Sequence, residues 1–141
     1  MNKDLSDILF VAFREVGQSE INGSDDNPRI REYHAAVDGQ ELADEIPWCS
    51  SFVNWCLESC GFKGTGSRLA RSFENWGASI DTPLPGCIAV FKRGSKSWQG
   101  HVAIYLYETP KSIVVIGGNQ SNSVNVQAYS REKLIGYRTI A

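Results

Sequence analysis

The chain has 141 residues, 42% of them hydrophobic, which is enough to bury a core in one domain. Its net charge of −2 argues against a nucleic-acid partner, because proteins that bind the phosphate backbone carry a strongly basic face. No run of residues is long and apolar enough to span a membrane, so we expect no membrane insertion.

Two helices are predicted in the first part of the chain. Apolar residues recur at helical spacing over residues 4–16, and Gly17 is suited to end that helix. The segment lacks the small-residue cleavage site of a signal peptide, so we expect synthesis in the cytoplasm with reduced thiols. A second helix is predicted from Pro28, with Asn27 as its N-cap, and His34 is expected to be structural on its surface.

Residues 45–61, EIPWCSSFVNWCLESCG, hold three of the four cysteines. Their apolar spacing predicts a helix from about Trp48 or Cys49 to Gly61. At about 1.5 Å per residue, Cys49 and Cys56 lie roughly 10 Å apart along the axis, too far for a disulfide. A zinc site would need close ligand pairs such as C-x-x-C, which are absent from the sequence. The cysteines other than Cys49 are therefore best explained as small core residues.

Cys49 differs because it begins the predicted helix. Unpaired N–H groups and the positive end of the helix dipole stabilise a thiolate there, and the same N–H groups can bind an oxyanion. The alternative is a fourth buried thiol, and the helix by itself does not decide between the two. A partner base is needed.

The second half of the chain predicts one further helix and then a sheet. Residues 67–77 have helical spacing, with Leu69, Ala70, Phe73 and Trp76 expected to face inward. After them, segments with alternating apolar residues predict short antiparallel strands: GCIAVFK, GHVAIYLYE, SIVVIGG, SVNVQA and LIGYRTI. Helices followed by strands indicate an α+β fold.

His101 is the candidate base, because it opens a predicted strand directly after a loop. A hairpin that pairs Glu108 with Ser112 sets His101 opposite Asn119, where an amide can hydrogen-bond an imidazole. A slip of one residue would offer Gly118 or Gln120 instead. The set of thiol, imidazole and amide matches the nucleophile, base and orienting residue of cysteine hydrolases.

The segments PWCSSFVNW, PGCIAVFKRG, GHVAIYLYE, IVVIGGNQS and IGYR, in this order, resemble the CHAP and NlpC-type cysteine hydrolases that cut bacterial peptidoglycan. They are most similar to a small phage- and bacterium-associated subgroup. The resemblance implies one catalytic domain over residues 1–141 with a papain-like fold, helices packed on an antiparallel sheet. It also implies that Cys49 is the nucleophile, His101 the base and Asn119 the polar third residue. The family's activity is N-acetylmuramoyl-L-alanine amidase or peptide endopeptidase.

The sequence departs from this family at two places. Cys87 stands where relatives usually carry an acidic residue. Gly117 stands where many CHAP relatives have Glu, so a neutral Asn119 must orient His101. Some CHAP domains bind calcium, but GSDDN (residues 23–27) lacks an ordered ligand series, so we predict no metal and no cofactor.

Four further residues are candidates for substrate binding. Trp48 and Trp98 flank the predicted catalytic pair in sequence, and each is equally explained as a packing residue. Gln120 is the alternative third residue and a possible substrate contact. Lys96 belongs, with Lys92 and Arg93, to a basic loop before His101 that is either a solvated loop or a positive rim for stem-peptide carboxylates. No chemical role is assigned to Glu20 or Asn27.

The leading hypothesis is a monomeric wall-lytic enzyme, acting through a thioester on bacterial peptidoglycan. Without a signal peptide it would reach the periplasm or wall by a separate route, as a phage endolysin with a holin or as a bacteriolytic toxin with an immunity partner. The alternatives are a non-catalytic module that binds wall peptides, and a cytoplasmic thiol protease or acyltransferase on the same fold.

Overall fold

The computed structural model describes residues 3–21, 26–43 and 47–141, so the expectations for residues 23–25 and 46 lie outside it. In the described part the helices come first, namely α1 (Lys3–Arg14), α2 (Pro28–Asp38), α3 (Cys49–Ser59) and the 3₁₀ helix η1 (Ala70–Asn75). The remaining elements are β1 (Ala78–Ile80), β2 (Ile88–Lys92), β3 (Gly100–Glu108), β4 (Ser112–Gln120), β5 (Ser123–Ser130), η2 (Arg131–Lys133) and β6 (Leu134–Thr139). None of these helices is both long and apolar enough to cross a membrane.

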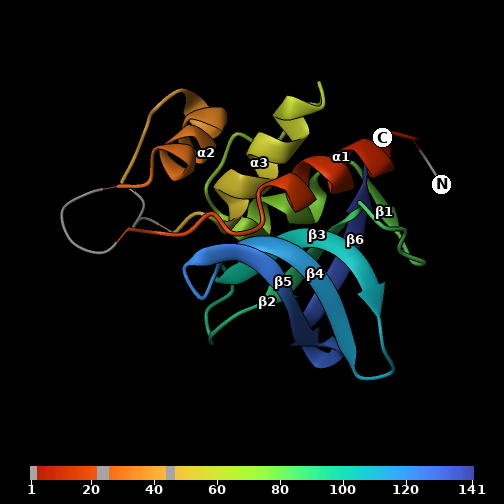
Figure 1. Ribbon diagram of the computed structural model, residues 1–141. Helices are drawn as coiled ribbons and strands as arrows, with labels where there is room; N and C mark the ends of the chain where they lie inside the picture. Colours follow the sequence, from red (N-terminus) through yellow and green to blue (C-terminus); the bar gives the residue numbers. More distant parts are fainter. Residues whose placement is uncertain (1–2, 22–25, 44–46) are drawn as a thin grey trace.

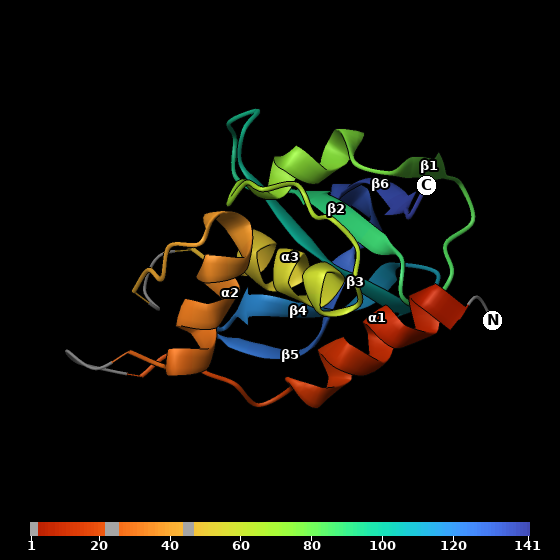
Figure 2. The ribbon, with the colours of Figure 1, turned by 90° about the horizontal axis from the view of Figure 1, so that it is seen from above.

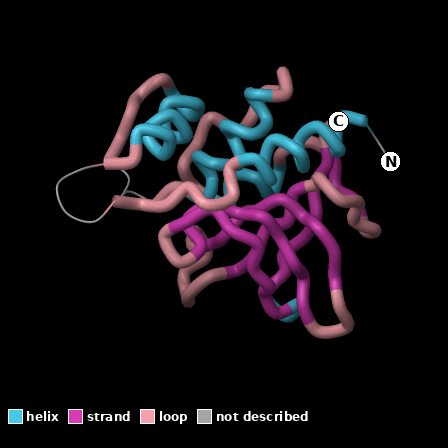
Figure 3. The backbone as a smooth tube through the Cα atoms, in the orientation of Figure 1, coloured by secondary structure: helices cyan, strands magenta, loops and turns pink. Residues whose placement is uncertain are grey.

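The strands form one antiparallel sheet in the order β1-β6-β2-β3-β4-β5. The α-helices lie together on one face of this sheet (Figures 1 and 3). Seen from above, α3 lies between α2 and α1 and runs over the middle of the sheet (Figure 2). This arrangement confirms the predicted α+β fold, with helices packed on an antiparallel sheet.

Helix α3 packs directly on β4 because β4 contains a glycine at the contact. A Cβ at Gly118 would lie 2.7 Å from the Cβ of Phe52 and 2.7 Å from the Trp48 ring, closer than real side chains approach. Both of those residues are fully buried in the core between helices and sheet. The close approach brings the start of α3 next to β3 and β4, the strands that carry His101 and Gln120.

The central strands are buried on both faces, which the predicted alternation did not anticipate. Strands β2, β3 and β4 contain continuous buried runs, whereas β5 alternates as expected. The face of the sheet away from the α-helices holds a second apolar cluster that includes Cys87, Phe91, Tyr105 and Tyr137. Continuous apolar runs are typical of strands covered on both sides.

The predicted helix over residues 67–77 is shorter than expected and is a 3₁₀ helix. The carbonyl of Ser67 accepts hydrogen bonds from the side chains of Ser50 (2.7 Å) and Asn54 (3.3 Å), so it is already engaged by α3. Helix η1 therefore begins at Ala70. Leu69, predicted to face inward, is 54% exposed.

Candidate active site

Cys49 is the first residue of α3, as the sequence predicts. The helix has no side-chain N-cap, and its first intrahelical bond runs from the Phe52 N–H to the Trp48 carbonyl at 2.9 Å. The N–H groups of Cys49 and Ser50 precede that bond, so neither has an acceptor within the helix. Cys49, which is 6% exposed, thus lies beside backbone donors without helical partners at the positive end of a helix.

The surroundings of Cys49 favour its thiolate. Burial, the largest single effect, raises the pKa of the thiol, and the hydrogen bond and charge of His101 oppose that rise. The backbone N–H groups of Val102 and Ser50 add to this effect, and the net pKa lies below the ordinary thiol value. Burial instead raises the pKa of Cys87 to about 11, and burial also raises the pKa of Cys56.

His101 lies at the start of β3, buried and packed against aromatic rings. Its ring centroid is 6.3 Å from that of Phe91 and 4.9 Å from that of Tyr129. Its Nε2 lies 2.8 Å from Oε1 of Gln120. Because a carbonyl oxygen only accepts, Nε2 carries the proton and Nδ1 is left as the basic nitrogen for the Cys49 thiol.

The amide of Gln120 is itself held in one orientation. Its Nε2 donates to the backbone carbonyl of Asn125 at 2.9 Å and to Oδ1 of Asn125 at 2.8 Å. The Asn125 amide donates in return to the Gln120 carbonyl at 2.7 Å. Because both of these partners are oxygens, they accept from the NH₂ group of Gln120. The other side-chain atom of Gln120, Oε1, must therefore face His101. The chain of contacts runs from Cys49 through His101 and Gln120 to Asn125.

The hairpin register predicted at the turn is wrong by one residue. Glu108 pairs with Ile113 rather than Ser112. A bulge between Tyr105 and Tyr107 inserts an extra residue in β3 and restores the predicted register, so that Ile104 pairs with Ile116. The strands therefore approach His101 in the predicted alignment, for a reason that the turn sequence did not reveal.

Asn119 was predicted to contact His101, but the structure gives that contact to Gln120. Asn119 has a φ of 57°, in the left-handed region, and the β4–β5 register shifts between Gly117 and Gln120. This local turn directs Asn119 to the cleft beside Cys49 and Gln120 to the imidazole. Gly117 leaves the necessary space, since a Cβ there would lie 2.3 Å from Oε1 of Gln120.

A cleft of about 470 Å³ opens beside Cys49. It is lined by Pro47, Cys49, Arg68, Leu69, Ala70, Arg93, Trp98, Gln99, Gly100 and Asn119. Trp98, which is 58% exposed, lies in this lining, as the substrate-groove explanation requires. Lys96 is exposed but lies outside the lining, where Arg93 takes part instead.

Trp48 does not line the cleft, contrary to the substrate-groove explanation. Its side chain is fully buried, stacks on Tyr33 at 5.8 Å between centroids, and donates from Nε1 to Glu20 at 2.9 Å. Glu20 thereby gains a structural role. Asn27 also has one, because its side chain accepts from the Arg29 N–H and caps α2 as predicted.

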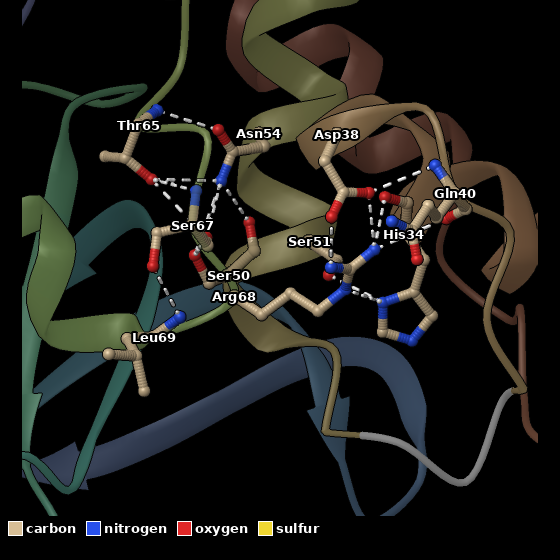
Figure 4. Close-up of polar contacts among 10 residues, drawn as sticks. All are labelled: His34, Asp38, Gln40, Ser50, Ser51, Asn54, Thr65, Ser67, Arg68 and Leu69. Carbon is tan, nitrogen blue, oxygen red and sulfur yellow. Dashed lines mark hydrogen bonds and ion pairs between the residues drawn. The ribbon is translucent and has the colours of Figure 1, made fainter.

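Polar side chains that follow Cys49 in α3 hold the segment leading to Arg68, a residue of the cleft lining (Figure 4). Asn54 accepts from the N–H groups of Thr65 (2.8 Å) and Gly66 (3.2 Å), so α3 holds the segment that leads to Arg68. Arg68 in turn donates to Nδ1 of His34 at 3.1 Å and forms two hydrogen bonds with Asp38. His34, expected on the surface, is fully buried in this network. Its role is structural, as predicted.

The sequence profile of the CHAP domain matches residues 42–119, more than half of the chain and the segment that carries Cys49, His101 and the start of the turn at Asn119. The chain belongs to the CHAP domain family. CHAP and NlpC/P60 proteins are generally cysteine peptidases or amidases that act on peptidoglycan.

A solved structure supports the fold of this CHAP domain. A Staphylococcus aureus protein described as similar to a lipoprotein of the NLP/P60 family aligns with 100% of the chain, with a TM-score of 0.59 and 17% identity. The chain spans 43% of that protein's length. No curated protein matches the sequence.

Sequence reasoning missed the parts of this site that depend on strand pairing. Asn125 carries no motif, and only the β4–β5 register brings it to Gln120. Tyr129 was likewise not singled out, although its ring packs on His101. Within the described residues, no group of three or more His, Cys, Asp or Glu side chains is arranged to hold a metal ion.

Cys49 should alkylate with iodoacetamide at pH 7 about ten times faster than Cys60, although Cys60 is the more exposed thiol. The lowered pKa of Cys49 increases its thiolate fraction at neutral pH, whereas burial raises the pKa of Cys60 and decreases that fraction. Peptide mapping over time measures both rates. His101→Ala should remove the difference, and equal labelling of the two in the unmodified protein would contradict the assignment of Cys49.

Proposed function

We propose that this CHAP domain hydrolyses amide bonds of bacterial peptidoglycan, with Cys49 as nucleophile, His101 as general base and acid, and Gln120 as the residue that orients His101. The observation that carries the proposal is the contact of a thiol of lowered pKa with an imidazole whose other nitrogen is fixed by a buried amide. A module that only bound wall peptides would have no use for this arrangement.

The groups present supply a complete acyl-transfer sequence. Nδ1 of His101 takes the proton of Cys49, and the thiolate attacks the carbonyl carbon of the amide. The resulting oxyanion is stabilised by N–H groups of the first turn of α3. His101 then gives its proton to the leaving nitrogen, the C–N bond breaks, and a thioester remains. Water attacks the thioester with His101 as base, which releases a carboxylate and restores the thiol.

Cleavage at a glycosidic bond is not supported by the cleft. That reaction needs two carboxylates on either side of the sugar linkage, one of them with a raised pKa. The cleft lining, in the part of the chain that the structure describes, contains no Asp or Glu. A thiolate with an imidazole instead suits a carbonyl substrate.

Digestion of purified peptidoglycan tests the proposal. The protein should release new amino groups and no new reducing sugar ends, and Cys49→Ala protein should release neither. Mass spectrometry of the fragments then identifies the bond. New reducing ends that persist in the Cys49→Ala protein would contradict the cysteine mechanism.

The same digest separates the two activities of the family. We favour the N-acetylmuramoyl-L-alanine amidase reaction, which frees intact stem peptides from muramic acid. New amines within peptide cross-links would instead assign a peptide endopeptidase and leave the mechanism unchanged. In either case we propose a wall-lytic role in the periplasm or wall, as a phage lysin or a delivered toxin.

A further inference from the structure

Among the described residues, the cleft lining contains positively charged side chains and no negatively charged ones. The positively charged side chains are those of Arg68 and Arg93. The charge of Arg68 is neutralised, because Asp38 accepts hydrogen bonds of 2.8 and 2.9 Å from its two terminal nitrogens. The same pairing lowers the pKa of Asp38 to about 2, so the carboxylate stays ionised at neutral pH. Arg68 therefore has a structural role in the wall of the cleft, and its charge is not available to bind a ligand.

Arg93 is different. Its side chain is exposed, and none of the ion pairs among the described residues includes it. Its charge acts on the catalytic side of the cleft. Burial raises the pKa of Tyr129 to about 12, with a further increase from Cys49, and the positive charge of Arg93 opposes that rise. Arg93 and Cys49 line the same cleft, so this charge lies on the side of the proposed nucleophile.

The loop that carries Arg93 is held in place. Arg71 of η1 donates to the Gln99 carbonyl at 2.9 Å, and the Gln99 side chain accepts from the Lys96 N–H at 3.0 Å. Gly94 permits the tight turn around that side chain, since it has a φ of 63° and a Cβ there would lie 2.4 Å from Oε1 of Gln99. The loop can thus present Arg93 and Trp98 to a ligand with little loss of conformational freedom.

We propose that Arg93 binds a carboxylate of the peptide substrate near the scissile amide. The inference rests on the proposed function and names one chemical group that the cleft selects. A guanidinium without an acidic partner suits a carboxylate, and the exposed side chains of Leu69 and Trp98 offer apolar surface for the rest of the peptide. Among the described residues, the lining presents no carboxylate that would repel an anionic substrate.

Two sets of substrates test this role. The first consists of peptidoglycan fragments with free stem-peptide carboxylates, and the second of the same fragments with those groups converted to carboxamides. Wild-type protein should show a kcat/KM about tenfold higher on the free acids, and Arg93→Gln should remove that preference by slowing only the acids. Arg93→Lys should keep part of it. The preference should shrink as ionic strength rises.

Lys92→Gln is the matched control, because Lys92 is an exposed neighbour of the same charge that lies outside the cleft lining. It should leave both rates unchanged. If Arg93→Gln lowered kcat/KM equally on the free acids and on the carboxamides, or lowered neither, the proposed role of Arg93 would be wrong. The proposal of amide-bond hydrolysis would still stand. Failure of the wild type to cleave either set would instead count against the proposed function.

Discussion

Replacing Cys49 with alanine is expected to lower the rate of peptidoglycan hydrolysis by at least about 10⁵-fold, to background. Alanine removes the atom that forms the thioester, and no other thiol lies in the cleft lining of the described chain. The side chain is small and lies at the cleft, so the melting temperature should change little. Release of amino groups from peptidoglycan measures the activity, and circular dichroism measures the fold.

Two further variants sharpen this result. His101→Ala should be nearly as damaging, since the nucleophile and its base act as one unit and their losses do not add. Cys60→Ala should retain full activity, because that thiol lies at the far end of α3. Residual activity of Cys49→Ala above about 1% of the wild type would contradict the assignment of the nucleophile.

The positions of the proposed nucleophile and base could be predicted because each residue depends on local features. Cys49 follows from the start of a helix, and His101 from a strand that follows a loop. Both signals come from neighbouring residues in the chain, as do the cap at Asn27 and the order of helices before strands. The α+β fold needed no knowledge of long-range contacts.

The third member could not be fixed in the same way, because it depends on departures from regular strand geometry. The bulge in β3 and the left-handed conformation of Asn119 decide which amide meets the imidazole. Nor could the sequence show that Trp48 is buried, since this depends on α2 and on Glu20 covering it. Likewise, the early end of the predicted helix near Ser67 reflects hydrogen bonds from α3.

Gln120→Ala is expected to reduce kcat/KM by roughly 10²- to 10³-fold without abolishing activity. The Gln120 amide keeps the proton on Nε2 of His101 and so leaves Nδ1 free for Cys49. Without it, the ring is free to adopt the other tautomer, which cannot accept the thiol proton. Because the amide is neutral, its loss removes orientation rather than charge, and a fraction of the molecules stays active. Rates on peptidoglycan fragments, with iodoacetamide labelling of Cys49 in parallel, measure both consequences.

Asn119→Ala is the matched control, since it removes an adjacent amide of similar chemistry that lines the cleft, while the hydrogen bond to His101 comes from Gln120. Its loss should be below about tenfold. Gly117→Ala should imitate Gln120→Ala although it touches neither catalytic residue, because its methyl group would take the place of the Gln120 oxygen. Asn125→Leu should have a smaller effect of the same kind, by freeing the Gln120 amide to turn. A larger loss for Asn119→Ala than for Gln120→Ala would instead make Asn119 the orienting residue, and the local turn at the end of β4 would then have to rearrange when substrate binds.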